Sequence, residues 1–181
     1  MDSPVAPREA TEGDFEAIVQ LFRKHEILCT LGHEQGNDDW SRMGQAYVEH
    51  TLQTEMSSWE TCSGRFASAG SKLWVIEDFG KVVGCVGAVE LGPGSLELVR
   101  MYVDASCRRR GFGRLLVQAL LDHAVALGAS EIQLTTPQVN SVGIRFYQEM
   151  GFFLRRSFPV EVDGLTLELV ELAQVVEVKP T

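Results

Sequence analysis

The chain has 181 residues, 45% of them hydrophobic and 23% charged, with a formal net charge of −9. This length suits one domain around one core, and no apolar run approaches the ~20 residues that a membrane-spanning helix needs. The acidic balance argues against nucleic acid or an anionic membrane as a partner, and the first residues lack a basic stretch followed by an apolar one, so we expect a cytoplasmic protein.

Cysteine and histidine placement predicts neither disulfides nor a metal site. The four cysteines are scattered with no CxxC pair, which is typical of reduced thiols. His25, Cys29 and His33 are spaced four apart, as on one helical face. However, Leu31-Gly32 indicates that the helix ends there, and no fourth ligand follows at zinc-site spacing, so we expect no metal.

The N-terminal part predicts a short strand, two helices and a mobile loop, in that order. We expect them over residues 5–10, 12–27, 38–59 and 60–71. Thr11 followed by Asp14 is typical of a helix N-cap, and the second helix begins at Asn37 or Asp38. Residues 1–70 hold 12 acidic and 5 basic residues, so most of the acidic excess lies here.

A hairpin and a central strand follow. Lys72–Asp78 and Lys81–Leu91 are apolar runs separated by Phe79-Gly80, and Gly84 and Gly87 inside the second run indicate a bulge or a close backbone approach. Residues 96–103 then predict a central strand. Its period of two places Glu97, Val99, Met101 and Val103 on one face and Leu98, Arg100 and Tyr102 on the other.

A basic, glycine-bearing turn joins this strand to a helix that Gly128 ends. Its residues are Arg108, Arg109, Arg110, Gly111, Phe112, Gly113 and Arg114. The unpaired amides of a helix N-terminus, together with arginines, suit an anion such as a pyrophosphate; the alternative is a solvated turn that serves solubility. The turn lacks the Gly-Lys-Ser/Thr of a P-loop and, at Leu116, the third glycine of a dinucleotide fingerprint.

The C-terminal part predicts a strand, a short helix and a final strand pair. Glu131–Thr136 returns parallel to the central strand through the helical crossover. Asn140 or Ser141 caps the short helix. The last strands are expected over residues 152–156 and 165–172, and the tail from Gln174 as a poorly ordered segment or an edge extension.

Two motifs carry a family resemblance. Arg108-x-x-Gly111-x-Gly113, after an apolar strand and opening a helix, resembles the acetyl-CoA signature of the GNAT N-acetyltransferase superfamily. The run from Asn140 to Phe152, NSVGIRFYQEMGF, resembles the family pattern N-x-x-(A/G)-x-x-(F/L)-Y-x-x-x-G-F. The order of elements matches that family over essentially the whole chain, and best over residues 72–156.

The resemblance implies an α/β fold with a mixed sheet of about seven strands, a splayed βαβ unit and about four helices. It implies one domain over residues 1–181, in which residues 1–70 form the variable acceptor side and residues 96–156 the acetyl-CoA-binding core. The expected activity is acetyl-CoA-dependent N-acetyl transfer to a primary amine by direct attack in a ternary complex. The alternative is a non-catalytic acyl-CoA-binding module of the same fold. In either case the protein is expected as a monomer or a homodimer.

The resemblance also implies site residues. The pantetheine arm would bond to the backbone of Met101, Tyr102 and Val103, with the Met101 N–H facing the thioester carbonyl, while the basic turn takes the pyrophosphate. Asn140 would contact the pantetheine arm near the thiol end of the arm; alternatively, Asn140 only caps the helix that follows it.

The implied catalytic residues are Glu97 and Tyr147. Glu97, fourteen residues before Gly111, matches the glutamate base of the histone-acetyltransferase branch; otherwise it binds the acceptor ammonium or an internal arginine. Apolar neighbours would raise the pKa of its carboxyl. Tyr147 matches the tyrosine that protonates the leaving thiolate, unless it is only a buried aromatic. The acidic N-terminal part favours a cationic acceptor, although acidic surfaces also serve solubility.

Overall fold

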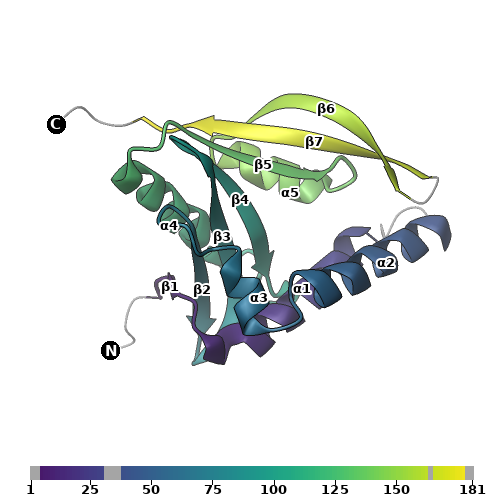
Figure 1. The fold of residues 1–181 in the computed structure, drawn as a ribbon, viewed down its shortest axis with the longest axis horizontal. Coiled ribbons are helices and arrows are strands. Elements are labelled where there is room, and N and C mark those ends of the chain that lie inside the picture. The colour runs from purple at the N-terminus through teal and green to yellow at the C-terminus, as the bar shows by residue number, and fades with distance from the viewer. Residues whose placement is uncertain (1–4, 31–37, 163–164, 178–181) are drawn as a thin grey trace.

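The computed structural model describes residues 5–30, 38–162 and 165–177. A seven-stranded mixed sheet runs in the order β1-β2-β3-β4-β5-β7-β6, with helices on both faces (Figure 1). The strands are β1 (Arg8–Glu9), β2 (Lys72–Asp78), β3 (Lys81–Gly92), β4 (Ser95–Val103), β5 (Glu131–Pro137), β6 (Phe153–Val162) and β7 (Leu165–Val175). The helices are α1 (Phe15–Thr30), α2 (Asp38–Thr54), α3 (Trp59–Gly64), α4 (Phe112–Leu127) and α5 (Ser141–Glu149), with short 3-10 helices η1 (Glu12–Asp14) and η2 (Ala105–Cys107).

The predicted α/β fold with about seven strands is confirmed, and the central position of β4 with it. The described residues form five α-helices, one more than expected. A search of these residues finds no helix long and apolar enough to cross a membrane and no group of His, Cys, Asp and Glu side chains suited to a metal ion. His33 and the Cys29 side chain lie outside the described residues.

Two hydrophobic cores lie on opposite faces of the sheet. Leu116 and Leu120 of α4 pack on one face together with Ile132 of β5. Ile18 and Phe22 of α1 pack on the other, against β2 and β3. Because β2 and β3 are covered on both faces, their sequences read as continuous apolar runs rather than as an alternation.

The predicted cap of the first helix is confirmed, although the helix begins as the 3-10 helix η1. The Asp14 carboxylate accepts the Thr11 backbone N–H at 2.8 Å and the Thr11 hydroxyl at 2.9 Å. Arg8 of β1 donates to both Asp14 oxygens, at 2.8 and 2.7 Å. The Arg8 hydrogen bond above all lowers the pKa of Asp14 to about 2.

The expected long second helix and the loop after it are wrong in part. α2 ends at Thr54, and Ser58 starts the separate helix α3 by accepting the Thr61 N–H at 3.2 Å. Met56 between the two helices is buried, which turns the chain back onto the sheet. Residues 60–64, expected as part of a mobile loop, therefore belong to helix α3, because a serine cap outweighs their small, polar composition.

The central strand contains a bulge that the period of two did not predict. Cys85 of β3 pairs with Tyr102, and Gly87 pairs with Val99, so β4 takes three steps where β3 takes two. Arg100 sits in this step with a φ of +53°. A bulge of this kind reverses the facing of the residues that follow it.

The predicted facing is therefore wrong beyond Val99. Leu96 and Leu98, before the bulge, and Met101 and Val103, after it, all pack on the α4 side. Arg100 and Tyr102 instead face α1, on the same side of the sheet as Glu97.

The final strands differ from the expected order in one respect. β5 runs parallel to β4, as predicted. β7 lies between β5 and β6, and Gln174 pairs with Ile132. The tail was expected as a loose segment or an edge extension, but through Val175 it forms an inner part of the sheet, because β6 is the edge strand.

Candidate functional site

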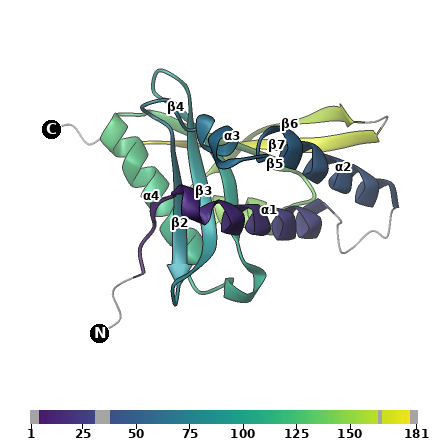
Figure 2. The ribbon, with the colours of Figure 1, turned by 60° about the horizontal axis from the view of Figure 1, so that its bottom comes forward.

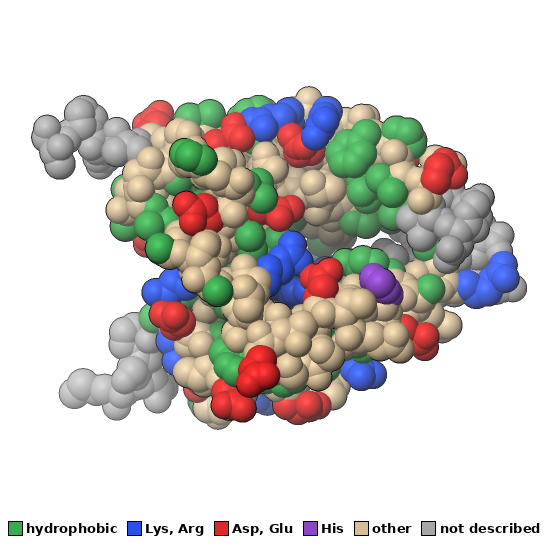
Figure 3. Space-filling model, in the orientation of Figure 1, with side chains coloured by type: hydrophobic (Ala, Val, Ile, Leu, Met, Phe, Trp, Pro, Cys, Tyr) green, Lys and Arg blue, Asp and Glu red, His purple; other side chains and the backbone are tan. Residues whose placement is uncertain are grey.

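The two parallel central strands separate shortly after they meet. β4 and β5 pair only from Ser95 with Glu131 to Glu97 with Gln133. Beyond Glu97 the two strands diverge, as Figures 1 and 2 show, so the rest of β4 has no partner strand on that side. Figure 3 shows the molecule hollowed between the α1–α2 layer and the β5–β7 arm, with Lys or Arg side chains at the inner end of the hollow and acidic ones beside them.

The start of α4 has the features of an anion site. Gly111 precedes the helix with a φ of +89° and no side-chain cap, and the first helical bond runs from the Leu115 N–H to the Gly111 carbonyl. The amides of the preceding residues therefore have no intrahelical partner. Gly111 is required here because the left-handed conformation favours glycine, and Arg109 just before it also has a positive φ, +60°.

The arginines of this turn divide into two pairs. Arg110 donates to both oxygens of Asp78 at 2.6 and 3.0 Å, and Arg114 donates to Glu149 at 2.9 Å. These two tie the turn to the β2–β3 hairpin and to α5. Arg108 and Arg109 are exposed, and no carboxylate of the described chain pairs with either of them. They are the two guanidinium groups left to meet an anion.

Close packing at Gly113 joins the predicted cofactor elements. A Cβ built on Gly113 would lie 3.3 Å from the Phe146 ring and 3.4 Å from the Met101 side chain. Phe112 beside it is buried in the α4 core. The start of α4, the far half of β4 and α5 therefore meet at one place, as the resemblance implies.

The side chains of the three predicted β4 contacts do not point to one place. Met101 and Val103 pack toward α4. Tyr102 is buried on the opposite face, where its ring lies 5.7 Å from Phe22 and 4.9 Å from His25. A ligand between β4 and β5 would thus meet the backbone of these residues.

Asn140 has the capping role that was one of its two predicted functions. Its side-chain oxygen accepts the Gly143 N–H at 3.1 Å, and its amide donates to the Thr136 hydroxyl at 3.0 Å. It thus ties the start of α5 to the end of β5, on the arm that lines the opening.

Tyr147 lies on the inner face of α5. It is only 8% exposed, and its ring makes edge-to-face contacts with Phe146 and Phe152 at 5.5 and 5.8 Å. The ring is thus part of the α4 core, as the buried-aromatic alternative predicted, and its position is held firmly.

Glu97 stands where β4 and β5 part, within a cluster of charged side chains. Its carboxylate lies 3.7 Å from Arg65, which follows α3. Glu55, which follows α2, accepts from Arg65 and from Arg100, both at 2.6 Å. Burial raises the pKa of Glu97, nearby Arg65 lowers it, and Glu55 raises it further. The expected rise is confirmed, and its main cause is desolvation.

Three members of this cluster were missed from the sequence. Arg100 was assigned to the wrong face because the irregularity was predicted in β3, from Gly84 and Gly87, and the extra residue lies in β4. Glu55 and Arg65 lie far from the two motifs and were placed near a helix end and in a loop. Only tertiary packing brings them to Glu97, since α2 lies against α1 and both α2 and α3 join the core that contains Tyr102 of β4.

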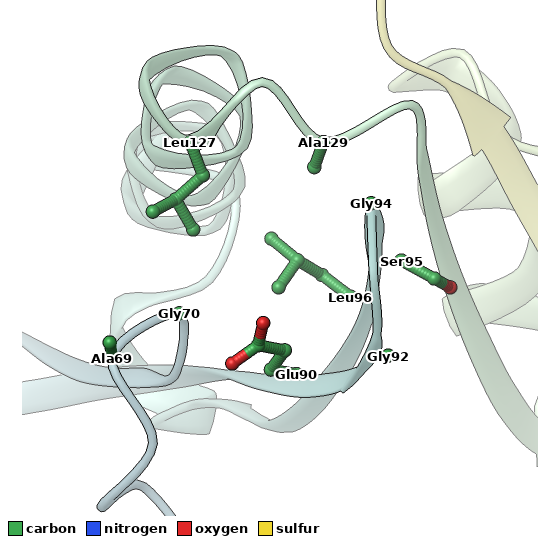
Figure 4. A pocket seen from close by; sticks show the side chains of 9 residues that line it. All are labelled: Ala69, Gly70, Glu90, Gly92, Gly94, Ser95, Leu96, Leu127 and Ala129. Atoms are coloured by element: carbon green, nitrogen blue, oxygen red, sulfur yellow. The ribbon is translucent and has the colours of Figure 1, made fainter.

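A separate pocket lies at the other end of the β3–β4 hairpin (Figure 4). Its volume is about 160 Å³. It is lined by Ala69, Gly70, Glu90, Gly92, Gly94, Ser95, Leu96, Leu127 and Ala129. None of these is a predicted site residue, and the pocket adjoins the end of α4 rather than its start.

Solved structures share this fold. The PaiA N-acetyltransferase from Thermoplasma acidophilum, in complex with coenzyme A, superposes with a TM-score of 0.73 at 16% identity, over 96% of this chain and 99% of that one. The spermidine N-acetyltransferase from Vibrio cholerae, in complex with CoA and spermine, gives 0.65 at 19% identity, over 97% of each chain. At these identities the likeness concerns the fold alone.

Sequence comparisons identify the family. N-acetyltransferase 8 of Homo sapiens is 36% identical over 111 residues, 59% of this chain and 48% of the relative. N-acetylaspartate synthetase of Homo sapiens is 33% identical over 129 residues, 70% of this chain and 42% of the relative. The chain thus spans about half the length of these relatives. A sequence model of the Acetyltransferase (GNAT) family matches residues 35–152. Because this match covers more than half of it, the chain belongs to the GNAT acetyltransferase family.

Proposed function

We propose that the protein is an acetyl-CoA-dependent N-acetyltransferase that transfers an acetyl group to a primary amine in a ternary complex. The observation that carries the proposal is the start of α4, where unpaired amides, the left-handed Gly111 and two uncommitted arginines adjoin the separation of β4 from β5. The names of the relatives, N-acetyltransferase 8 and N-acetylaspartate synthetase, support transfer to nitrogen.

The residues present fit acetyl-CoA as the donor. Amides of residues 109–114 and the side chains of Arg108 and Arg109 suit the pyrophosphate, since a helix N-terminus and guanidinium groups both bind phosphate oxygens. The unpaired edge of β4 from Met101 to Val103 suits the amide-bearing pantetheine arm, which would bond to it like an added strand. Asn140 fixes the opposite side of the opening through Thr136.

Each catalytic residue has one task in the transfer. Glu97 accepts a proton from the acceptor ammonium, directly or through a water, so that the nitrogen has a free electron pair. That nitrogen forms a bond to the thioester carbonyl carbon, whose oxygen takes up charge beside the Met101 N–H. The C–S bond then breaks, the electron pair stays on sulfur, and the Tyr147 hydroxyl supplies the proton that yields the free thiol. The new amide nitrogen loses its second proton to water, water returns a proton to the Tyr147 oxygen, and Glu97 releases its own proton to solvent.

The domain assignment follows from the same proposal. Residues 96–156 form the acetyl-CoA-binding core, and residues 1–70 form the acceptor side, since α2 and the residue after it reach the charge cluster at Glu97. The acidic excess of residues 1–70 favours an acceptor whose amine is positively charged in solution.

A non-catalytic acyl-CoA-binding module is the second candidate. Such a protein would need the start of α4 but neither a partly buried glutamate with a raised pKa nor Tyr147 as a proton donor. The two candidates differ in whether supplied amines cause the release of free thiol from acetyl-CoA.

The test combines thermal unfolding with thiol release. Acetyl-CoA at about 100 times its Kd adds about 2.7 kcal/mol to the free energy of unfolding, a rise of several degrees for a chain of this length. We expect this rise in the wild type, its loss in Arg108→Glu/Arg109→Glu, and its retention in the control Arg23→Glu, an exposed arginine on α1. A rise without thiol release for any amine would favour the non-catalytic module, and no rise in a folded protein would contradict both candidates.

A further inference from the structure

Two guanidinium groups share a single carboxylate oxygen close to Glu97, which stands at the last pair of β4 and β5. Glu55 Oε2 lies 2.6 Å from Arg65 Nη1 and 2.6 Å from Arg100 Nη2. The other terminal nitrogen of Arg65, Nη2, lies 3.7 Å from Glu97 Oε2. Arg65 thus lies between the Glu55 carboxylate, which is already paired with two arginines, and the Glu97 carboxylate, which is the proposed base.

This cluster holds more positive charge than its carboxylates balance during the reaction. Arg100 is buried, with its side chain 6% exposed, and its Nε is a buried donor with no partner among the described residues. The Phe22 ring at 5.5 Å, Tyr102 and Tyr47 also lie near it, and all three are uncharged. When Glu97 takes up a proton, two guanidinium groups face the one carboxylate of Glu55.

We propose that Arg65, held in place with Arg100 by Glu55, binds a carboxylate that the acceptor carries beside its amine, so that the acceptor is an α-amino acid. The inference rests on the proposed function, because it places the acceptor amine at Glu97. The amine and the carboxylate of an α-amino acid are attached to one carbon, and the 3.7 Å between Glu97 and Arg65 lets both groups be met at once.

Exposure supports this assignment of roles. The Arg65 side chain is 37% exposed and the Glu97 side chain 26%, so a ligand can reach both from solvent. Arg100 lies behind them and is a positioning residue, which keeps Glu55 and hence Arg65 in place. Arg65 Nη1 donates to Glu55 and Nη2 faces Glu97, so the acceptor's carboxylate would take the guanidinium hydrogens that these two contacts leave, in a charge-assisted hydrogen bond.

The same charges disfavour a polyamine. A diamine or polyamine with one ammonium at Glu97 would bring its second cation toward Arg65 and Arg100, where like charges repel. In a zwitterionic acceptor, the ammonium is attracted by the acidic residues of the N-terminal part, and the carboxylate is attracted by Arg65 and Arg100. The net charge alone predicts an acceptor with a positively charged amine. The arginines add that the same acceptor carries a carboxylate.

The first experiment compares matched acceptors on the wild-type protein by thiol release from acetyl-CoA. The panel contains the free α-amino acids, the α-carboxamide of each, and spermidine. An amide has the more readily deprotonated amine, so intrinsic reactivity favours it over the acid. We expect kcat/KM at least about 10-fold higher for an amino acid than for its amide or for spermidine, since a charge-assisted pair is lost. An equal or higher value for the amides or for spermidine would overturn the inference.

The second experiment removes Arg65. In Arg65→Gln we expect KM for the preferred amino acid to rise by on the order of 10-fold, while KM for its amide and for acetyl-CoA stay unchanged. Arg65→Lys should recover part of the loss, and Arg23→Gln on α1 is the control outside the site. An equal loss for acid and amide would assign Arg65 a purely structural role and contradict the inference.

The two proposals fail in different ways. Thiol release with no preference for a carboxylate removes the inference and leaves the acetyltransferase in place. No release with any member of the panel, in a protein that acetyl-CoA still stabilises, removes the proposed function and the inference with it.

Discussion

The acid–base properties of Glu97 depend on its position in the last residue pair between β4 and β5. Desolvation there raises the pKa of its carboxyl, and Arg65 opposes that rise. A base with a raised pKa is a stronger proton acceptor, provided that the pH lies above that pKa. Glu97 therefore acts as a base only where the pH lies above its raised pKa, and it loses this function as the pH falls through that pKa.

Replacing Glu97 by Gln removes the base and keeps the shape of the side chain. The variant depends on the small fraction of acceptor amine that is already neutral, and this fraction grows with pH. We expect a loss of kcat of about 100-fold on the low-pH side of neutrality, which narrows as the pH approaches the pKa of the amine. The measurement is a pH–rate profile together with the Kd of acetyl-CoA, which should stay unchanged. A profile of unchanged shape would exclude Glu97 from the mechanism.

Tertiary packing decides which residues join this site. Sequence reasoning placed Glu97 through a local motif spacing, and the raised pKa followed from its apolar strand neighbours. Arg65 and Glu55 have no comparable signal, since each is an ordinary charged residue near a helix end. Their place in the site depends on how α2 and α3 pack in the core on the α1 side of the sheet.

At the scale of elements, local signals predicted the segments that begin and end with special backbone geometry. Gly128, with a φ of +69°, ends α4, and Asn140 caps α5, both as expected. α3 was missed because Ser58, its cap, lies among small polar residues that are also typical of loops. Gly84 and Gly87 predicted a bulge or a close approach in β3, and the register with β4 shifts between Cys85 and Gly87. The extra residue itself lies in β4 at Arg100, where it leaves no mark in composition.

Gly87 shows how α3 is seated on the sheet. A Cβ at this position would lie 2.5 Å from the Phe66 ring and 3.1 Å from the Val99 side chain. Phe66, just after α3, therefore rests directly on the β3 backbone, and the small size of Gly87 permits this approach. The contact fixes the segment that also carries Arg65.

Gly87→Ala should accordingly destabilise the protein. We expect a loss of about 1–3 kcal/mol in the free energy of unfolding, as for other overpacked sites, measured by urea denaturation. The double variant Gly87→Ala/Phe66→Leu should lose less than the two single variants added together, because the clash is with the ring.

Gly64→Ala is the matched control for that experiment. Gly64 lies in α3 with nothing within 4 Å of its Cβ position, so alanine there should be neutral or stabilising by up to about 1 kcal/mol. If Gly87→Ala were as harmless as Gly64→Ala, Phe66 would not be packed on β3.

At the scale of the whole molecule, the sheet is divided by the separation of β4 from β5. β1 to β4 with α1 to α4 form one side, β5 to β7 with α5 the other, and three register pairs from Ser95 to Glu97 join the two strands. The order of elements predicted this parallel pair, but not how short the pairing is. The length of a ladder depends on the twist and bulge of its strands, which the sequence pattern does not reveal.

The separation of β4 from β5 predicts which backbone amides acetyl-CoA protects from hydrogen exchange. If the pantetheine arm lies between the two strands, acetyl-CoA should slow amide hydrogen exchange in residues 98–103 and 109–114 over the same concentration range, because one ligand covers both. Residues 133–137 of β5 should follow them, while β6, the far edge strand, serves as the internal control and should change little. Protection confined to residues 109–114 would support the proposed pyrophosphate site and contradict the proposed position of the pantetheine arm along β4. Protection centred on residues 127–130, beside the pocket of Figure 4, would contradict the proposed site, because it would move the ligand from the start of α4 to its end.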